Sequence, residues 1–171
     1  MQKRTAFKLC LAGAAAVALN AAPVSVYAKD EPLKVACVYV SPANEEGWSS
    51  QHDIARKFVE EKFGDKIKVT WIENIPENAD AQRVIRDLAQ QGNKLIFATS
   101  FGYMNSVMKV AKQFPNVYFE HATGYKTSKN VKNYTARFYE GRYLAGMLAA
   151  ATTKTNILGY VDALPMTAVF Q

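Results

Sequence analysis

Seven residues in three short segments have side chains suited to holding a small planar molecule. They are Asn44, Trp48, Ser100, Phe101, Gly102, Asn105 and His121. Trp48 offers a large flat surface on which an aromatic ring can stack, and Phe101 could form the second side of an aromatic clamp. Asn44 can donate and accept hydrogen bonds at the polar edge of such a ring. Both aromatic residues also have a structural alternative, in which Trp48 packs over the start of a helix and Phe101 lies in the core.

The other candidates would shape the site or add polar contacts. Ser100 has a hydroxyl that can bind a ligand or cap a helix, and Gly102 lets the backbone approach a ligand closely because it has no side chain. His121 follows an apolar run, where it could reach a ligand or serve as a structural hydrogen-bonding residue. Asn105 adds an amide in the same segment as Gly102. The structural alternatives stay open for Ser100 and His121.

The sequence lacks the residue patterns of common enzymes. Residues 41–48 contain no G-x-G-x-x-G sequence for a dinucleotide, and no G-x-S-x-G nucleophile motif occurs. His52 and His121 belong to different predicted elements, with no activated nucleophile beside either. Cys37 lies in an apolar run, where a cysteine usually behaves as a small buried hydrophobic residue. We therefore expect a binding protein with no cofactor and no metal ion, and keep a Rossmann-like enzyme as the weakest alternative.

The N-terminal segment has the layout of a cleaved signal peptide. Three basic residues open the chain, an apolar run follows over residues 9–19, and small residues lead to a cleavage position after Ala28. The apolar run is shorter than the roughly 20 residues of a membrane-spanning helix. Lipid attachment at Cys10 is not expected, because Lys8 stands where such signals carry small neutral residues. We expect residues 1–28 to be removed and the rest to reach the periplasm.

The charge of the chain does not indicate a nucleic-acid partner. The formal net charge is +6, but Lys and Arg are spread along the sequence and interleaved with Asp and Glu. A nucleic-acid-binding surface would gather its basic residues on one face or along one helix. We expect a mildly basic, solvated surface and no nucleic-acid binding.

Apolar runs and helical patterns alternate along the rest of the chain. The predicted strands are residues 33–40, 67–72, 95–99, 117–120, 134–138 and 157–161, and the predicted helices are 49–63, 79–91, 102–114 and 140–153. This alternation predicts an α/β fold in which helices flank an open parallel sheet. In the first helix the apolar positions fall on one face. They are Ile54, Ala55, Phe58, Val59 and Phe63.

The predicted sheet would gather the candidate residues at one edge. Ligands of open parallel sheets bind beyond the carboxyl ends of the strands. This rule selects the loops after the first, third and fourth strands, at residues 41–49, 100–105 and 121–125. We expect these loops to form the binding site.

The pattern also predicts where the domains divide. Residues 29–133 contain enough alternating elements for one lobe of common domain size. Residues 134–171 contain a predicted strand, a helix and a short final run, which cannot close a second core. We interpret this region as a hinge strand and the incomplete start of a second lobe.

Several longer segments resemble one known family. They are Gly47-Trp48-Ser49, residues 80–89, 99–104, 114–126 and 136–146, and they cover much of the chain after residue 32. Together they resemble the basic membrane protein (BMP) family, whose members are substrate-binding proteins of ABC transporters. The resemblance implies a type I periplasmic-binding-protein fold, with two α/β lobes that close over a ligand.

The resemblance also implies a ligand and a partner. Family members bind purine bases or nucleosides, and the Trp48-bearing version resembles the purine-binding branch. The implied partner is an ABC permease in the inner membrane. Related sequences often carry Asp where this chain has Asn105, so a contact that depends on that negative charge is not carried over.

Two alternatives concern the missing second lobe. The chain could be a truncated, non-functional fragment of such a binding protein, because one lobe offers only half of an enclosing site. Alternatively, it could pair with a separately encoded second half. The sequence does not distinguish these possibilities, nor does it identify the purine or nucleoside, the permease or the oligomeric state.

Overall fold

The computed structural model describes residues 31–161, in which strands and helices alternate. The strands are β1 (Leu33–Val38), β2 (Ile67–Ile72), β3 (Leu95–Ala98), β4 (Tyr118–Ala122) and β5 (Val131–Tyr134). The helices are α1 (Trp48–Phe63), α2 (Ala79–Gln90), α3 (Met104–Ala111) and α4 (Phe138–Thr152), with short 3-10 segments η1 (Gly64–Lys66) and η2 (Phe101–Tyr103). The predicted signal peptide, residues 1–28, lies outside the described residues, as do residues 162–171 at the end of the predicted second-lobe segment.

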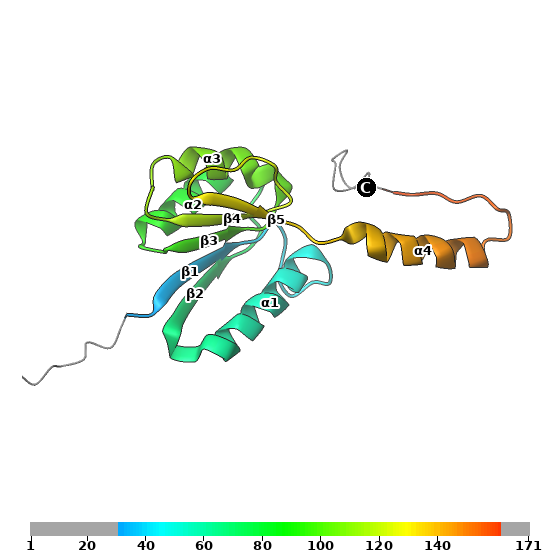
Figure 1. Ribbon diagram of the computed structural model, residues 1–171, viewed down its shortest axis with the longest axis horizontal. Helices are drawn as coiled ribbons and strands as arrows, with labels where there is room; N and C mark the ends of the chain where they lie inside the picture. The colour runs from blue at the N-terminus through cyan, green and yellow to red at the C-terminus, as the bar shows by residue number, and fades with distance from the viewer. Residues whose placement is uncertain (1–30, 162–171) are drawn as a thin grey trace, which may run out of the picture. The chain divides into compact units, whose positions relative to one another are not determined.

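The five strands form one parallel sheet in the order β2-β1-β3-β4-β5. Helices α2 and α3 lie on one face of the sheet and α1 lies on the other (Figure 1). Val35 of β1 pairs with Val69 of β2 and with Leu95 of β3. The predicted α/β fold with a parallel sheet flanked by helices is therefore confirmed.

Strand β1 is an interior strand of the sheet, and nearly all of it is apolar. Val35, Cys37 and Val38 are buried, as expected for a strand with neighbours on both sides and helices over both faces. Burial raises the pKa of the Cys37 thiol to about 11, so the thiol stays protonated at neutral pH. Cys37 therefore behaves as the small hydrophobic residue that its apolar surroundings predict.

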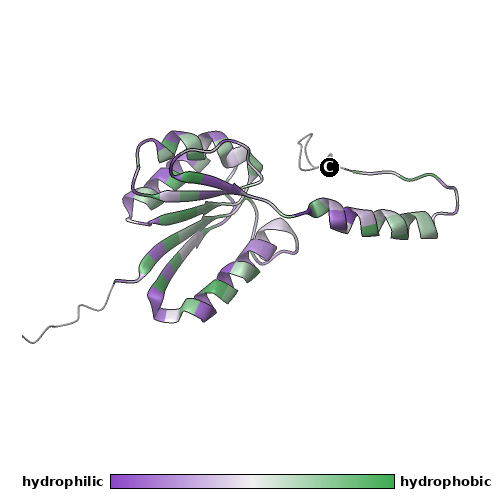
Figure 2. Ribbon diagram, viewed as in Figure 1, coloured by the Kyte–Doolittle hydropathy of each residue, from purple (hydrophilic) through white to green (hydrophobic). Residues whose placement is uncertain are grey.

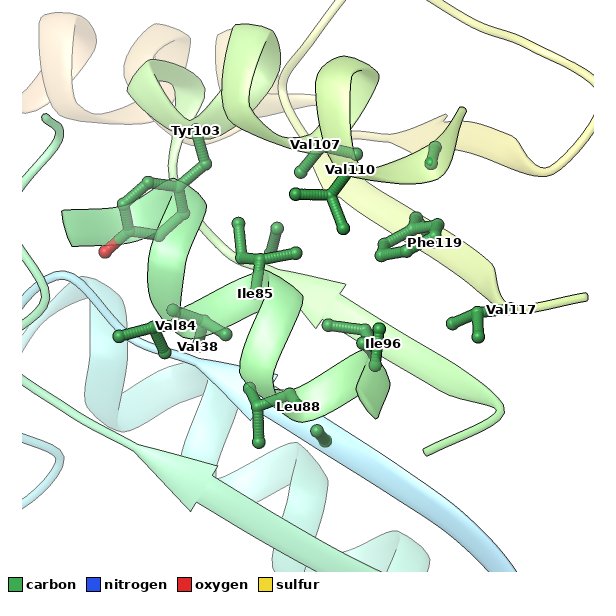
Figure 3. Packing of buried hydrophobic residues seen from close by; sticks show 14 of the residues in the cluster. Val38, Val84, Ile85, Leu88, Ile96, Tyr103, Val107, Val110, Val117 and Phe119 are labelled. Carbon is green, nitrogen blue, oxygen red and sulfur yellow. The ribbon is translucent and has the colours of Figure 1, made fainter. Parts of the chain in front are cut away.

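The main hydrophobic core lies between the sheet and helices α2 and α3. Ile85 and Leu88 of α2 and Val107 of α3 pack over Ile96 and Phe119 of the sheet (Figure 3). All five residues are at most 1% exposed. Close packing of this kind supplies most of the favourable free energy of folding in a small domain.

Helix α1 buries a different face from the one that its apolar residues predict. Ile54 and Phe58 are 58% and 62% exposed, whereas Asp53 and Arg56 are buried against the sheet. Arg56 donates to the Asp53 carboxylate at 2.6 Å, and its guanidinium lies 3.9 Å from the centre of the Trp71 ring. Much of the apolar face predicted for this helix is therefore exposed, because an ion pair stacked on β2 occupies the contact with the sheet.

The space between α1 and the sheet is not completely filled. A cavity of about 200 Å³ lies there, and its lining includes Val35, Val59, Phe97 and Tyr134. These are apolar or aromatic side chains from both surfaces. The α1 side of the sheet is therefore less tightly packed than the α2–α3 side.

Two strand predictions differ from the structure. The predicted strand 134–138 is replaced by β5 at Val131–Tyr134, because β5 pairs with β4 and that pairing ends at Ala122 opposite Tyr134. The polar residues Lys132 and Asn133 in β5 interrupt the apolar pattern from which a strand is predicted.

Residues 157–161 form no strand and are all exposed. An apolar run becomes a strand only where a neighbouring strand can satisfy its backbone hydrogen bonds, and no described strand lies beside this one.

Helix α4 exposes apolar residues along its length. None of its residues is buried, and Tyr143, Leu144 and Leu148 are 71%, 66% and 66% exposed. The helix is coloured mainly as hydrophobic or neutral (Figure 2). A helix of this composition usually packs against other parts of a protein.

None of the helices within residues 31–161 is both long enough and apolar enough to cross a bilayer.

Candidate ligand-binding site

The loops after β1, β3 and β4 lie together at the carboxyl edge of the sheet. The Trp48 indole N–H donates to the backbone carbonyl of Thr99, which joins the start of α1 to the end of β3. Nε2 of His121 lies 2.7 Å from the carbonyl oxygen of Ser100, which joins β4 to the same loop. The structure thus brings Trp48, Ser100 and His121 into one neighbourhood, as parallel strands require.

Trp48 stands at the margin of an open groove. Its hydrogen bond to Thr99 fixes the orientation of the ring, which is 37% exposed. The ring centroids of His52 and Phe138 lie 4.9 and 5.9 Å away, both tilted. The groove has a volume of about 490 Å³, and it is lined by Gly47, Trp48, Gln51, His52, Ala55, Ala122, Thr123, Tyr134, Thr135, Ala136 and Phe138. A groove of this size, with aromatic walls and few polar groups, suits a small planar ligand.

Phe101 and Asn105 form a second cluster around the β3–α3 loop. The Phe101 ring is half-buried and lies 6.3 Å from the ring of Tyr125. The Asn105 amide oxygen accepts a hydrogen bond of 2.8 Å from the Lys126 ammonium group. Asn44 is exposed in the β1–α1 loop. The seven predicted residues therefore lie in or directly beside the three loops at one edge, some of them in the adjoining strand or helix, but Trp48 and Phe101 belong to separate aromatic groups.

Ser100 and Gly102 are engaged by a residue that the sequence did not single out. The Glu77 carboxylate accepts hydrogen bonds from the Ser100 hydroxyl and, at 3.0 Å, from the Gly102 amide. Ser100 precedes η2 but makes no side-chain cap to it. Its hydroxyl therefore holds a neighbouring loop in this structure.

His121 is enclosed by the protein. It is 1% exposed, and Gly124 lies so close that an added Cβ would overlap its Nδ1 atom. Because a carbonyl oxygen only accepts, Nε2 must carry the hydrogen that it donates to Ser100. Nδ1 and the Asn133 side-chain oxygen have no hydrogen-bond partner among the described residues. This geometry favours the structural alternative for His121, since a direct ligand contact would require the loop containing Gly124 to move.

We expect acid to destabilise the chain partly through His121. Burial lowers the pKa of His121 below its ordinary value of 6.5. The unfolded chain then binds a proton first, so the stabilising contribution is complete above about pH 6.5 and is lost as the pH falls towards the folded-state pKa. Urea titrations at about pH 7.5 and about pH 5.5 measure this loss.

The matched variants are His121→Gln, which keeps an N–H donor for Ser100, and His52→Gln, which removes the other histidine. We expect a smaller difference between the two pH values in His121→Gln than in wild type, and His52→Gln serves as the control for the loss of a histidine. Equal pH dependence in wild type and His121→Gln would rule out His121 as the source.

Other residues at the site had no recognisable signal in the sequence. His52 and Tyr134 line the groove, with ring centroids 6.2 Å apart, yet they lie on α1 and β5. Thr123 also lines it and has a positive φ of 62°. This conformation is unusual for a β-branched residue and occurs often at functional sites. Only tertiary structure brings these three residues together.

Between residues 31 and 161, no group of three or more His, Cys, Asp or Glu side chains is arranged to hold a metal ion.

A parallel sheet between helices, with a groove beyond the carboxyl ends of its strands, defines the N-terminal lobe of a type I periplasmic-binding-protein fold. Solved structures share this fold. The solute-binding protein of an ABC transporter system from Conexibacter woesei has a TM-score of 0.59 and 22% identity, covering 69% of this chain and 40% of the other. One from Aeropyrum pernix has a TM-score of 0.61 and 20% identity, covering 70% and 32%.

The chain belongs to the Bmp family, described as ABC transporter substrate-binding protein PnrA-like, whose sequence profile matches residues 33–171. The resemblance to the BMP family is thereby confirmed. The family is one of solute-binding proteins rather than enzymes.

Two relatives illustrate the similarity and its extent. A protein of Brucella abortus named as purine-binding is 54% identical over 142 residues, which are 83% of this chain and 41% of that protein. A protein of Haloferax volcanii, whose name proposes an ABC transporter glucose-binding function, is 40% identical over 136 residues, 80% of this chain and 34% of that protein. The chain therefore spans less than half the length of these relatives.

Proposed function

We propose that this chain is the first lobe of an extracytoplasmic ABC-importer component that binds a purine base or nucleoside. The observation that carries the proposal is the groove of about 490 Å³ beside Trp48. The indole is held in place by its hydrogen bond to Thr99 and remains 37% exposed. A preoriented aromatic surface favours planar ligands, because stacking needs little further ordering of the side chain.

The names of relatives support a purine more than a sugar. The Brucella abortus protein is named as purine-binding, and a Lactococcus lactis relative, 37% identical over 76 residues, is named as nucleoside-binding. The Haloferax volcanii name points instead to glucose. The planar aromatic wall at Trp48 suits a base, whereas a sugar would require a larger set of hydrogen-bonding side chains in the groove.

A second lobe would complete the site. The apolar residues Leu144 and Leu148 of α4 are exposed, and so is Phe58 of α1. Exposed apolar surface of this kind usually marks a packing surface. We propose that further structure covers these residues in the working protein and closes over the ligand, which an ABC permease then receives.

The proposal predicts saturable binding that depends on Trp48. Calorimetric titration of the 171-residue chain with adenine, guanine, adenosine and guanosine should give heat for at least one of them, and glucose should give none. Trp48→Ala should weaken the binding by about 5- to 150-fold, the loss of one aromatic–base stack. Trp48→Phe should weaken it less, because a stacking face remains.

Tyr118→Ala is the matched control, because Tyr118 is an exposed aromatic residue at the start of β4, away from the carboxyl edge. Circular dichroism verifies folding in each sample. Equal weakening by Trp48→Ala and Tyr118→Ala would refute a stacking role for Trp48. A folded chain that binds no purine would support the alternative of a fragment without independent activity.

A further inference from the structure

The β2–α2 loop, residues 73–78, contacts two of the three loops that carry the candidate site. It lies outside them in sequence and was not selected by the carboxyl-edge rule. Glu73 accepts a hydrogen bond of 2.8 Å from the backbone amide of Ala43, in the β1–α1 loop that leads to Trp48. Glu77 accepts from Ser100 and Gly102 in the β3–α3 loop that contains Phe101. The β2–α2 loop therefore contacts both the loop that leads to Trp48 and the loop that contains Phe101.

The Glu77 contacts define the conformation of the β3–α3 loop. The carboxylate binds the Ser100 hydroxyl and, two residues later, the Gly102 amide at 3.0 Å, so that Phe101 lies between the two attachment points. Bonds to a charged acceptor are stronger than bonds between neutral groups. The Tyr103 hydroxyl adds a 2.5 Å bond to the carbonyl oxygen of Ile75 in the same β2–α2 loop.

A side chain at position 102 would compete with the Glu77 carboxylate for the same space. A Cβ added at Gly102 would overlap the carboxyl carbon and both carboxyl oxygens of Glu77. The backbone of Gly102 has no positive φ, so an alanine is compatible with its conformation. The conflict between Glu77 and a residue-102 side chain is therefore one of space alone.

We propose that Glu77 is a positioning residue of the binding site, which fixes the Ser100–Gly102 segment and through it the orientation of Phe101. Glu73 likewise holds the β1–α1 loop, by accepting a hydrogen bond from the Ala43 amide. The inference rests on the proposed function in one respect, that a bound ligand extends from the Trp48 groove to the β3–α3 loop, whose residues do not themselves line that groove. Its structural part, that Glu77 holds the loop, does not depend on any ligand.

Four variants separate the effect of the Glu77–Gly102 hydrogen bond from the effects of losing a negative charge or of unfolding. Glu77→Ala removes the acceptor, Glu77→Gln keeps an acceptor oxygen without the charge, and Gly102→Ala displaces the carboxylate. Glu61→Ala is the charge-matched control, since Glu61 is exposed on α1. Hydrogen exchange of the Gly102 amide, measured by NMR on the 171-residue chain, reports directly on the bond to Glu77. Adenosine and adenine titrations report on the site.

In Glu77→Ala we expect the Gly102 amide to exchange about tenfold faster or more, and purine affinity to fall by about 10-fold, as for a lost bond to a charged group. Gly102→Ala should have a similar effect on affinity, and the double variant should be no worse than either single one, because both act through the same contact. Glu77→Gln should recover most of the affinity, and Glu61→Ala should match wild type.

Unchanged Gly102 exchange in Glu77→Ala would overturn the inference, and so would additive losses in the double variant. If wild type binds no purine, the proposed function fails for this chain, and amide exchange alone decides whether Glu77 holds the loop.

Discussion

Replacing Ile85 with alanine is expected to lower the free energy of unfolding by about 2–5 kcal/mol, whereas replacing Ile54 should change it by less than about 0.5 kcal/mol. Both are isoleucines in helices, but Ile85 is 0% exposed in the core between α2 and the sheet, and Ile54 is 58% exposed on α1. The first change leaves a cavity, while the second removes side-chain atoms that already contact water.

Urea denaturation monitored by circular dichroism measures both changes, with the midpoint as the readout and an unchanged slope as the check on two-state behaviour. The comparison of Ile85→Ala with Ile54→Ala tests whether the apolar face of α1 is buried or exposed. The sequence pattern places Ile54 on the apolar face of this helix, and a buried position there would be costly to replace. A large loss in Ile54→Ala would mean that other parts of the chain cover this face of α1, and would contradict the structure described for residues 31–161.

Replacing Arg56 with methionine is expected to destabilise the chain by about 3 kcal/mol, at the lower end of the range for breaking a buried ion pair. The Arg56 and Asp53 side chains are each 5% exposed, with 2.6 Å between Nε and Oδ1. Methionine keeps the length of the side chain and removes its charge. Asp53 would then retain Lys57 at 2.9 Å, which moderates the loss.

The pH dependence supplies a second readout for the same variant. Burial alone would raise the pKa of Asp53, but hydrogen bonds and charge from Arg56 and Lys57 outweigh it and lower that pKa. The stabilising contribution of Asp53 is therefore present above its ordinary pKa and is lost as the pH falls through the lowered value. In Arg56→Met the pKa of Asp53 is lowered less, so we expect a smaller loss of stability between neutral and acid pH than in wild type.

Two further variants decide whether the effect belongs to the buried pair. Asp53→Leu combined with Arg56→Met should recover part of the stability, because both buried charges are then replaced and Glu60, the other ion-pair partner of Arg56, has a side chain that is 35% exposed. Glu140→Ala breaks the exposed pair with Arg137 and should cost at most about 1 kcal/mol. A double variant that is less stable than Arg56→Met would show that the charges are individually required.

The unequal packing of the two sheet faces bears on how such a lobe functions. The α2–α3 side is closely packed, so it supports the strands whose carboxyl ends carry the candidate site. The α1 side carries a cavity of about 200 Å³, a buried ion pair and exposed apolar residues. Trp48 begins α1, so the position of its ring depends on the less closely packed side.

Local sequence patterns determined the alternation of elements and the class of fold. The apolar run of β1, the helical repeat of α2 and the breaks between them depend on neighbours within a few residues, so a linear pattern records them. The rule that parallel strands share a carboxyl edge then placed the candidate loops correctly, including those of Trp48, Ser100 and His121. Family resemblance added the expectation of a two-lobed architecture and of a purine or nucleoside ligand.

Tertiary structure alone decided which surfaces meet. The apolar residues of α1 form a helical face in sequence, but the orientation of α1 is set by the Asp53–Arg56 pair against Trp71 of β2. The extent of β5 depends on pairing with β4, and residues 157–161 lack such a partner in the described structure. Glu77 reaches Gly102 across 25 positions of sequence. Such contacts depend on how separate elements are arranged in space, which the periodicity of a single segment does not record.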